Sequence, residues 1–326
     1  MKALPRVSIG LPVYNGEPFL EQAIDSLLSQ TYSNFELIIS DNASTDRTGE
    51  ICAAYAARDL RIRYHRNVQN IGVDRNFNRA FELATGEYFR WSSADDLCGP
   101  TLLERCVELL GHRSDVILCY PKTRYIDEKG AFLRDWDDKL HLDHPKPEKR
   151  FATYLWNICM CNAAFGMIRS SVLRKTKLFG IYSDSDIVFL GELALHGRFF
   201  ELPEVLFFRR IHPGIAVRKY PTTHQRMAMS EPSKPGKLWF PHWKVFTGFL
   251  SAIHRAPLSW TERALCYARM HVWLRRRGSD LGVDLKFALR YVLSVRRSRG
   301  RRRDAGAAAG GLSVRETENA ILPSKR

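Results

Sequence analysis

The chain has 326 residues, enough for one large domain or for one domain with a substantial extension, and its hydrophobic content of 45% is ordinary for a protein with a full core. Its apolar runs are shorter than the roughly 20 residues of a spanning helix and its start lacks a cleavage-site pattern, so we expect neither a transmembrane helix nor a signal peptide. The formal net charge of +15 favours negatively charged partners: phosphates, nucleic acid or anionic lipid.

The first ninety residues alternate between short apolar runs and amphipathic stretches. Apolar runs at 7–14 and 35–40 predict strands, and the helical spacing of apolar residues predicts helices over 18–30 and 48–58. The alternation continues with a strand at 61–67, a helix at 74–86 and a strand at 87–93. Such βαβ units predict an α/β fold with a Rossmann-like, mainly parallel sheet flanked by helices. Ligands bind at the carboxyl ends of such strands, so the polar segments after the first, second and fourth strands should converge.

Two adjacent carboxylates, Asp95 and Asp96, follow the predicted strand at 87–93. Like charges this close raise each other's pKa unless a cation lies beside them. Oxygen ligands suit Mg²⁺ or Mn²⁺, which one or two carboxylates usually hold together with substrate phosphates. The alternative is a solvated turn or cap before the apolar-periodic stretch at 99–110, where acids favour a helix start.

Three ordered blocks carry a resemblance to a known family. They are "VSIGLPVYNGEPFLEQAIDSLLSQTYSNFELIISDNASTDRT" (7–48), "NIGVDRNFNRAFELATGEYFRWSSADDL" (70–97) and "FGIYSDSDIVFLGELALHGRFFELPEVLFFRRIHPG" (179–214). Together they resemble the family-2 glycosyltransferases, inverting enzymes with a GT-A fold. The resemblance implies transfer of a sugar from a nucleoside-diphosphate donor, most often UDP, to a saccharide or lipid-linked acceptor.

The first loop and the second strand would hold the nucleotide, by this resemblance. Pro12, Tyr14 and Asn15 would contact the base and ribose, with Glu17 assisting from the start of the next helix. Asp41 would accept a hydrogen bond from the base, since an ionised carboxylate only accepts hydrogen bonds.

Polar residues farther along the chain complete the expected donor site. Asn42 lies beside Asp41, and Asn70, Gly72 and Asn78 match positions of the second block. Arg75 would reach a phosphate, with a solvated helix face as its alternative. The full set expected to bind the nucleotide sugar is Pro12, Tyr14, Asn15, Glu17, Asp41, Asn42, Asn70, Gly72, Arg75, Asn78, Ser93, Asp95, Arg209 and Arg210.

The second block ends in the family's metal motif, and Mn²⁺ or Mg²⁺ is the expected cofactor. The commonest form is Asp-Ala-Asp-Asp, whereas this chain has Ser93 at the first acid. A hydroxyl there can still bond a ribose or a metal-bound water, but the departure leaves open whether Asp95 or Asp96 is the direct ligand. By resemblance His212 approaches the metal or the diphosphate, with a surface histidine as the alternative.

An inverting transfer needs a base that takes the proton of the attacking hydroxyl. Asp186 matches the family's catalytic acid, Asp184 is its near rival, and the alternative for either is a cap on the helix that begins there.

Residues 199–213 predict two short strands around Pro203 that end on three basic side chains. By charge Arg209 and Arg210 would favour a leaving diphosphate, and either could instead cover the sheet with its stem.

The expected organisation is a glycosyltransferase domain at 1–219, an extension at 220–303 and a disordered tail at 304–326. Within the first, residues 1–98 would form the nucleotide-sugar half and 99–219 the acceptor half.

The extension begins with a turn-rich stretch at 220–245, expected to loop over the acceptor cleft, followed by amphipathic helices at 245–256 and 259–278. Residues 286–303 then hold eight Lys or Arg and no acid. Apolar residues among these charges favour an anionic membrane surface, with a solvated charged face as the alternative. No nucleic-acid-binding motif is present in the sequence, so nucleic acid is not an expected partner.

Two other functions compete with sugar transfer. A silent nucleotide-binding module of the same fold is suggested only by Ser93, and a nucleotidyltransferase would need a Gly-rich, Lys-bearing loop that the N-terminal region lacks. Seven irregularly spaced cysteines favour reduced thiols in the cytoplasm. The expected location is therefore cytoplasmic, peripheral on the inner face of the membrane if the basic stretch binds lipid, and the resemblance implies work in surface polysaccharide or glycolipid assembly.

Overall fold

The computed structural model describes residues 5–234 and 237–308, with the backbone alone for 294–308. These residues belong to two compact units that divide between Asp284 and Leu285, within the last helix.

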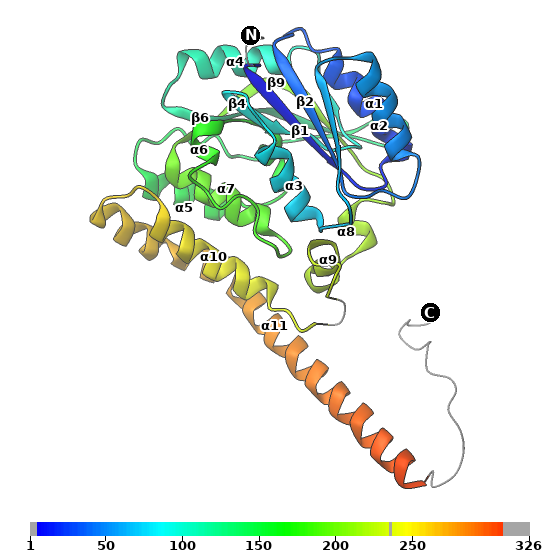
Figure 1. Ribbon diagram of the computed structural model, residues 1–326. Coiled ribbons are helices and arrows are strands. Elements are labelled where there is room, and N and C mark those ends of the chain that lie inside the picture. The colour runs from blue at the N-terminus through cyan, green and yellow to red at the C-terminus, as the bar shows by residue number, and fades with distance from the viewer. Residues whose placement is uncertain (1–4, 235–236, 309–326) are drawn as a thin grey trace. The chain divides into compact units, whose positions relative to one another are not determined.

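The described residues form a nine-stranded sheet in the order β3-β2-β1-β4-β8-β6-β9-β5, with β7 paired to β6 (Figure 1). Strands β1 to β4 run parallel, as the alternation predicts. The other half is mixed, because β8 is antiparallel to β4 and β6 whereas β9 is parallel to β6. The bounds are β1 Val7–Val13, β2 Phe35–Asp41, β3 Ile62–Arg66, β4 Tyr88–Trp91, β5 Leu97–Cys98, β6 Val116–Ile126, β7 Phe132–Trp136, β8 Met167–Arg169 and β9 Arg198–Arg210.

Helices cover both faces of the sheet. Residues of α1, α2 and α4 pack in one core, and residues of α3, α5, α7, α10 and α11 pack in the other. Strand β4 shows why both faces are apolar: Tyr88 enters the first core, while Phe89 and Trp91 enter the second. The bounds are α1 Glu17–Leu28, α2 Thr48–Arg58, α3 Val73–Glu82, α4 Leu102–His112, α5 Pro147–Asn157, η1 Asn162–Phe165, α6 Ser170–Leu173, α7 Ser185–His196, α8 Ala216–Lys219, α9 Thr223–Ser230, α10 Pro241–Arg255 and α11 Trp260–Ala308.

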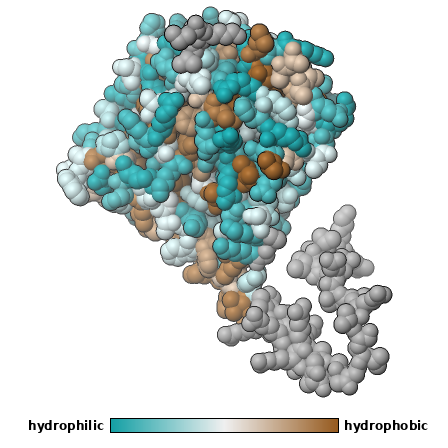
Figure 2. All heavy atoms as spheres, in the orientation of Figure 1, coloured by the Kyte–Doolittle hydropathy of each residue, from teal (hydrophilic) through white to brown (hydrophobic). Residues whose placement is uncertain are grey.

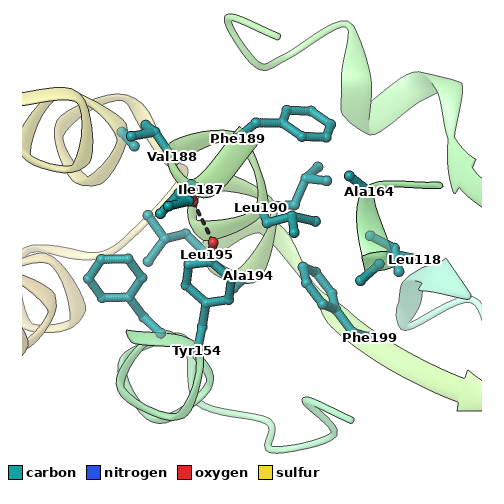
Figure 3. Close-up of a cluster of buried hydrophobic side chains, with 14 of the residues drawn as sticks. Leu118, Tyr154, Ala164, Ile187, Val188, Phe189, Leu190, Ala194, Leu195 and Phe199 are labelled. Carbon is teal, nitrogen blue, oxygen red and sulfur yellow. Dashed lines mark hydrogen bonds between the residues drawn. The ribbon is translucent and has the colours of Figure 1, made fainter. Parts of the chain in front are cut away.

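Ten of the twelve residues of helix α7 are buried, and Figure 3 shows its Ile187, Leu190 and Ala194 among other apolar side chains. The first turn of this helix carries Asp186. The hydroxyl of Tyr154 donates to the carbonyl of Ile187 at 2.5 Å, which ties α5 to the first turn of α7. A Cβ at Gly191 would lie 2.5 Å from the Phe249 ring, so α10 packs closely against this helix. In contrast to this core, polar and apolar residues are interspersed on the face drawn in Figure 2.

Strand β9 is continuous, which corrects the two short strands expected around Pro203. Leu202 pairs with Pro121 and Val205 pairs with Lys122, so Pro203 and the next residue bulge out of the ladder. A bulge accommodates a proline inside a strand because the bulged residue makes no hydrogen bond to the neighbouring strand, so the missing N–H of proline is not needed.

The C-terminal part also differs from expectation in two places. The turn-rich stretch at 220–245 contains α9, whose start is held by a capping box between Thr222 and Gln225. Residues 304–308 are helical, whereas 309–326 of the predicted tail lie outside the described residues. Within the described ranges, none of the helices has the length and hydropathy needed to cross a bilayer.

Candidate functional site

A cavity of about 870 Å³ opens at the carboxyl ends of β1 and β4 and beside the end of β9. The polar segments after the first, second and fourth strands converge there, as predicted from the strand order. Its lining residues are Pro12–Gly16, Pro18, Phe19, Asn42, Asn70, Val73, Asn76, Phe77, Ser93–Asp96, Tyr125, Arg134, Met160, Phe165, Arg209–His212, Gly214–Tyr220, Ala228, Met229 and Pro232.

The loop after β1 lines one side of the cavity. Tyr14 is half exposed, and Asn15 has a φ of 53°, which turns the chain toward α1. The Asn15 N–H donates to the Ser44 hydroxyl at 3.0 Å, so the loops after β1 and β2 are joined. Glu17 is not among the lining residues. Its carboxylate accepts from the Arg47 N–H at 3.2 Å and so connects the start of α1 to the loop before α2.

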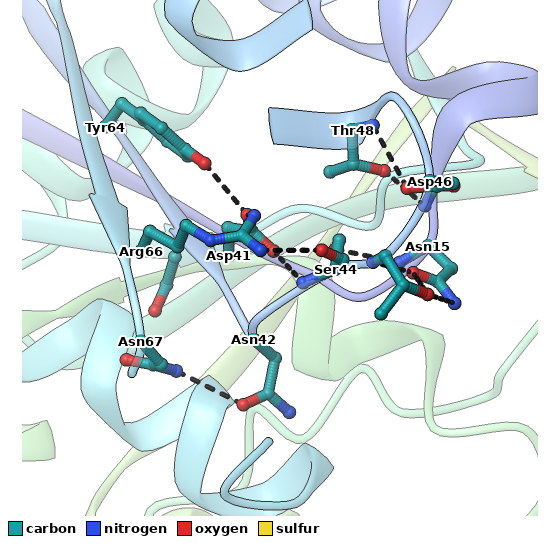
Figure 4. Close-up of polar contacts among 12 residues, drawn as sticks. Asn15, Asp41, Asn42, Ser44, Asp46, Thr48, Tyr64, Arg66 and Asn67 are labelled. Carbon is teal, nitrogen blue, oxygen red and sulfur yellow. Dashed lines mark hydrogen bonds and ion pairs between the residues drawn. The ribbon is translucent and has the colours of Figure 1, made fainter. Parts of the chain in front are cut away.

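Asp41 is fully buried, and Figure 4 shows its polar contacts with Ser44, Tyr64 and Arg66. Its carboxylate accepts hydrogen bonds from the Ser44 N–H at 2.8 Å, the Tyr64 hydroxyl at 2.8 Å and the Arg66 guanidinium at 2.7 Å. It does not line the cavity, whereas Asn42 does. Asp41 therefore shapes the loop that presents Asn42, and its contact with a base stays a prediction.

A network of amides continues from Asn42 into the third segment. The Asn42 amide donates to Asn70 at 2.9 Å, and Asn67 donates to both Asn42 and Asn76. Asn76 also lines the cavity, although it is not among the residues predicted from the sequence. Asn76 lies three residues after Val73 in α3, so both side chains are on the same face of the helix. This spacing is the sequence signal that could have identified Asn76.

Three residues of the second block lie outside the cavity lining. The Arg75 guanidinium, which was expected to contact a phosphate, instead forms an ion pair with Glu231 at 2.8 Å. The Asn78 amide bonds both backbone groups of Phe179, at 2.9 and 3.0 Å. Gly72 has a φ of 90° and packs against the carbonyl of Ser230. These residues join α3 to the chain around α7 and α9.

Asp95 faces the cavity together with His212. Their side chains meet at 3.0 Å between Oδ2 and Nε2, and the Ser93 hydroxyl donates to the other Asp95 oxygen. His212 Nδ1 accepts from the Gly214 N–H at 3.2 Å, so the ring proton lies on Nε2 and is donated to Asp95. Burial opposes ionisation of Asp95, but the hydrogen bonds from His212 and Ser93 outweigh it and lower its pKa.

Asp96 is buried and has a structural contact. Its carboxylate accepts from the Arg210 N–H at 2.8 Å, which fixes the end of β9. Burial, and then the charge of Asp95, raise the pKa of Asp96 to about 7.

The donor set fits a metal only in part. Within the described ranges, no three His, Cys, Asp or Glu side chains are grouped so as to hold a metal ion. Asp95 and His212 present one carboxylate oxygen and one imidazole nitrogen at the cavity, and such a pair suits a cation that takes its other ligands from a substrate diphosphate.

The two arginines at the end of β9 differ in their surroundings. Arg210 is 1% exposed, and its guanidinium donates to the Asp95 and Glu128 carbonyls at 2.9 Å and lies over the Phe19 ring. It therefore holds the sheet edge together. Arg209 is partly exposed, lines the cavity and donates to the carbonyl of Met160 at 3.0 Å.

Asp186 lies in the first turn of α7, directly after the turn in which Asp184 has a φ of 63°. Its carboxylate accepts from the Ile187 N–H at 2.9 Å, and it is not among the lining residues. Burial, and then the charge of Asp184, raise the pKa of Asp186. Asp184 itself pairs with Arg226 of α9 at 3.0 Å.

Solved structures with a similar fold include S. aureus TarS. The complex of TarS with UDP-GlcNAc aligns with a TM-score of 0.63 and 17% identity, over 83% of this chain and 73% of that one. The complex with UDP aligns with a TM-score of 0.60 and 17% identity, over 84% and 72%. At this identity the likeness shows the fold alone, and it confirms the predicted GT-A architecture.

Among curated proteins the chain is similar to uncharacterized glycosyltransferases. One from Rickettsia prowazekii is 28% identical over 86% of this chain and 80% of its own, and one from Rickettsia felis is 33% identical over 56% and 29%. A third, from Methanocaldococcus jannaschii, is 29% identical over 53% and 59%. The chain thus spans only part of the last two relatives. The family model "Glycosyl transferase family 2" matches residues 8–177, which is just over half of the chain. The predicted family is therefore confirmed, and the chain belongs to glycosyl transferase family 2.

Proposed function

We propose that the protein is an inverting, metal-dependent glycosyltransferase that moves a sugar from a nucleoside-diphosphate donor to a hydroxyl of a saccharide or lipid-linked acceptor. One observation carries the proposal: the loops after β1 and β2 and the Asp95–His212 pair line the same cavity. A nucleotide between the loops would thereby bring its diphosphate to the pair.

The donor's base and ribose are assigned to the loop side of the cavity. This side offers the aromatic ring of Tyr14, the apolar side chain of Pro12 and the polar side chain of Asn15. The amides of Asn42 and Asn70 lie there as well. UDP is the first choice of nucleotide. It is supported by the TarS complexes with UDP and UDP-GlcNAc and by the family's usual donors.

Asp95 and His212 are assigned to the diphosphate, where Asp95 would hold Mn²⁺ or Mg²⁺ with His212 beside it. When bound, the cation supplies positive charge to the oxygen that leaves. For His212 Nε2 to become a ligand, the ring proton must move to Nδ1 and the Gly214 contact must be given up. Asp96 keeps the end of β9 in place, and Ser93 orients Asp95.

Asp186 is assigned the role of base for the acceptor hydroxyl. Its raised pKa suits that role, because a base works best when its pKa approaches the operating pH. Its position outside the cavity lining means that the acceptor has to reach the first turn of α7. Loss of a positioned base typically lowers the rate about 10²–10⁴-fold.

The last helix is assigned to an anionic membrane surface, which would place the enzyme at the inner face of the cytoplasmic membrane and in polysaccharide or glycolipid assembly. Leu285, Leu289, Val292 and Leu293 are exposed at spacings that put them on one helix face, with Lys286 and Arg290 also exposed.

Calorimetric titration of UDP, GDP and dTDP with and without Mn²⁺ tests the donor site. We expect Mn²⁺-dependent binding of one nucleotide, weakened about tenfold or more in Asp95→Asn and unchanged in Asp115→Asn, a control whose carboxylate pairs with Arg113 elsewhere. Binding that ignores both the metal and Asp95 contradicts the proposal.

Hydrolysis of the donor sugar then separates a transferase from a silent nucleotide-binding module. If the protein is a transferase, we expect the wild type to release UDP slowly from UDP-sugars in a metal-dependent reaction. Nucleotide binding without any such release, in the presence of every acceptor tried, indicates the latter.

A further inference from the structure

Three cavity-lining side chains form a row across three strands of the acceptor half. In the sheet register Tyr125 of β6 lies opposite Arg134 of β7 on one side and opposite Arg209 of β9 on the other. Directly opposite residues point to the same face of a sheet. All three line the cavity, so the row presents two guanidinium groups and one phenol to it.

Tyr125 is 1% exposed, and its hydroxyl makes no well-aligned hydrogen bond within the described residues, although the Asn162 side chain lies near it. Burial raises the pKa of Tyr125, so the phenol keeps its proton and remains a donor. A buried hydroxyl without a well-aligned partner costs free energy, and next to a cavity such a donor is available to a ligand that brings an acceptor.

The arginines of the row are positioned but not neutralised. The Arg134 guanidinium lies 4.9 Å from the centre of the Tyr125 ring and 5.0 Å from that of Trp136. Among the described side chains, no carboxylate comes within ion-pair distance of Arg134 or Arg209. The charge of Arg209 acts on Asp96, Asp138 and Asp186 only at longer range.

Arg124 on the same hairpin shows the contrast. It precedes Tyr125 in β6, points to the other face, and pairs with Asp135 at 2.7 Å. The hairpin therefore supplies a carboxylate partner to Arg124, and it supplies none to Arg134.

We infer that Arg134, Tyr125 and Arg209 form a subsite for a phosphate group carried by the acceptor substrate; this rests on the proposed glycosyltransferase function. Two planar guanidiniums and a hydroxyl match a phosphate monoester in charge and in hydrogen-bond donors. The phosphate belongs either to a phosphorylated saccharide or to a lipid phosphate.

The row is assigned to the acceptor rather than the donor because of its place and its charge. The loops expected to hold the nucleotide follow β1 and β2, and its diphosphate is expected at Asp95 and His212, where a divalent cation balances it. Arg134 and Tyr125 come from the β6–β7 hairpin of the other half. Arg209 stands at the boundary, so the test relies on the other two residues.

Calorimetry in saturating UDP and Mg²⁺ tests the subsite. The probes are inorganic phosphate, glucose 1-phosphate, farnesyl phosphate and the neutral control methyl glucoside. We expect phosphate-bearing probes to bind the wild type about 10- to 100-fold more tightly than Arg134→Gln, with a smaller loss in Tyr125→Phe, which keeps the ring and removes only the hydroxyl. Arg124→Gln removes the same charge from the same hairpin and should bind like the wild type.

Each outcome decides a separate point. A preference for glucose 1-phosphate or for farnesyl phosphate identifies the source of the phosphate. Equal losses in Arg134→Gln and Arg124→Gln, or no phosphate binding by the wild type, overturn the subsite. Weaker UDP binding in Arg134→Gln moves the row to the donor and also overturns it. Failure of UDP to bind the wild type refutes the donor site, while the Arg134 dependence of phosphate binding, measured without UDP, still tests the row.

Discussion

Asp95 and Asp96 are neighbours in the chain, yet their carboxylates have opposite surroundings. Both residues line the cavity, but Asp95 accepts from His212, whereas Asp96 is 4% exposed and accepts from the backbone of Arg210. The pKa of Asp95 is therefore lowered, which favours its charged form, whereas the pKa of Asp96 is raised to about 7, so that Asp96 keeps its proton at lower pH. Adjacent acids of one motif thus divide into a ligand candidate and an anchor.

Asp74 on α3 is a second buried acid, 9% exposed, and it accepts from the Ser185 hydroxyl at the start of α7. Burial, then the charge of Asp186 among other contributions, raise its pKa from 3.8 to about 7. Between those values the folded state holds a proton that the unfolded state has lost, so the free energy of unfolding falls as the pH rises.

Asp74→Asn should remove this pH dependence. The wild type should lose up to about 4 kcal/mol of unfolding free energy from this group between about pH 4 and pH 8, and the variant should not. Urea unfolding at several pH values measures both. The difference between the two proteins isolates Asp74 from the other buried acids, and a constant difference across that range would contradict the assignment.

Asp186→Asn should slow transfer strongly without affecting the donor site. We expect the turnover rate to fall about 10²–10⁴-fold, because the base is lost, and the affinity for UDP to stay constant, because Asp186 does not line the cavity. Turnover and calorimetry on the same sample check this. A large loss of UDP affinity would place the residue in the donor site instead.

Helix α9 forms part of the cavity wall and rests on contacts with residues far away in the sequence. Its residues Ala228 and Met229 line the cavity, and Ser230 packs on Gly72 at the start of α3. A Cβ on Gly72 would lie 2.3 Å from the Ser230 carbonyl oxygen. The close approach, together with the φ of 90°, requires glycine at this position.

Gly72→Ala should destabilise the fold and weaken nucleotide binding, because α9 must move away. Gly130→Ala is the matched control, since Gly130 has a φ of 86° but nothing lies within 4 Å of the place that its new methyl group would take. The control should cost about 1–2 kcal/mol from backbone strain alone. Thermal unfolding and UDP titration compare them, and equal losses of stability with unchanged UDP affinity would show that α9 does not depend on this contact.

The sequence allows the nucleotide half to be predicted almost element by element, because β1 to β4 and their helices carry local periodicity and are neighbours in the chain. The mixed half is set by pairings far apart in sequence, such as β6 with β9, which no local pattern encodes. The site follows the same division. The loops and Asp95 are found from motifs, whereas the burial of Asp41 and the row through Tyr125 depend on which strands pair.

The net charge of +15 is concentrated toward the C-terminal end of the sequence. In the described part of α11 the exposed leucines accompany basic side chains, which is the combination that anionic bilayers attract. High salt should therefore weaken membrane binding, since exposed charges are screened beyond about 8 Å at physiological ionic strength.

Co-sedimentation with phosphatidylglycerol vesicles tests this surface in the full chain. We expect binding that Leu285→Ser/Leu289→Ser weakens about tenfold or more, because two leucines no longer enter the lipid. Leu60→Ser, at an exposed leucine after α2, should bind like the wild type. Equal binding to neutral phosphatidylcholine vesicles, or none to either, would exclude an anionic membrane surface as the partner.

The wall that α9 supplies has a consequence for the order of synthesis. The loops expected to contact the nucleotide lie in the first 98 residues, but Ala228, Met229 and Pro232 of the same cavity are added more than a hundred residues later. At about 5–20 residues per second, a ribosome needs on the order of ten seconds to cover that interval. The nascent chain therefore carries an open nucleotide half for seconds, and the cavity is complete only when the segment that closes it has emerged.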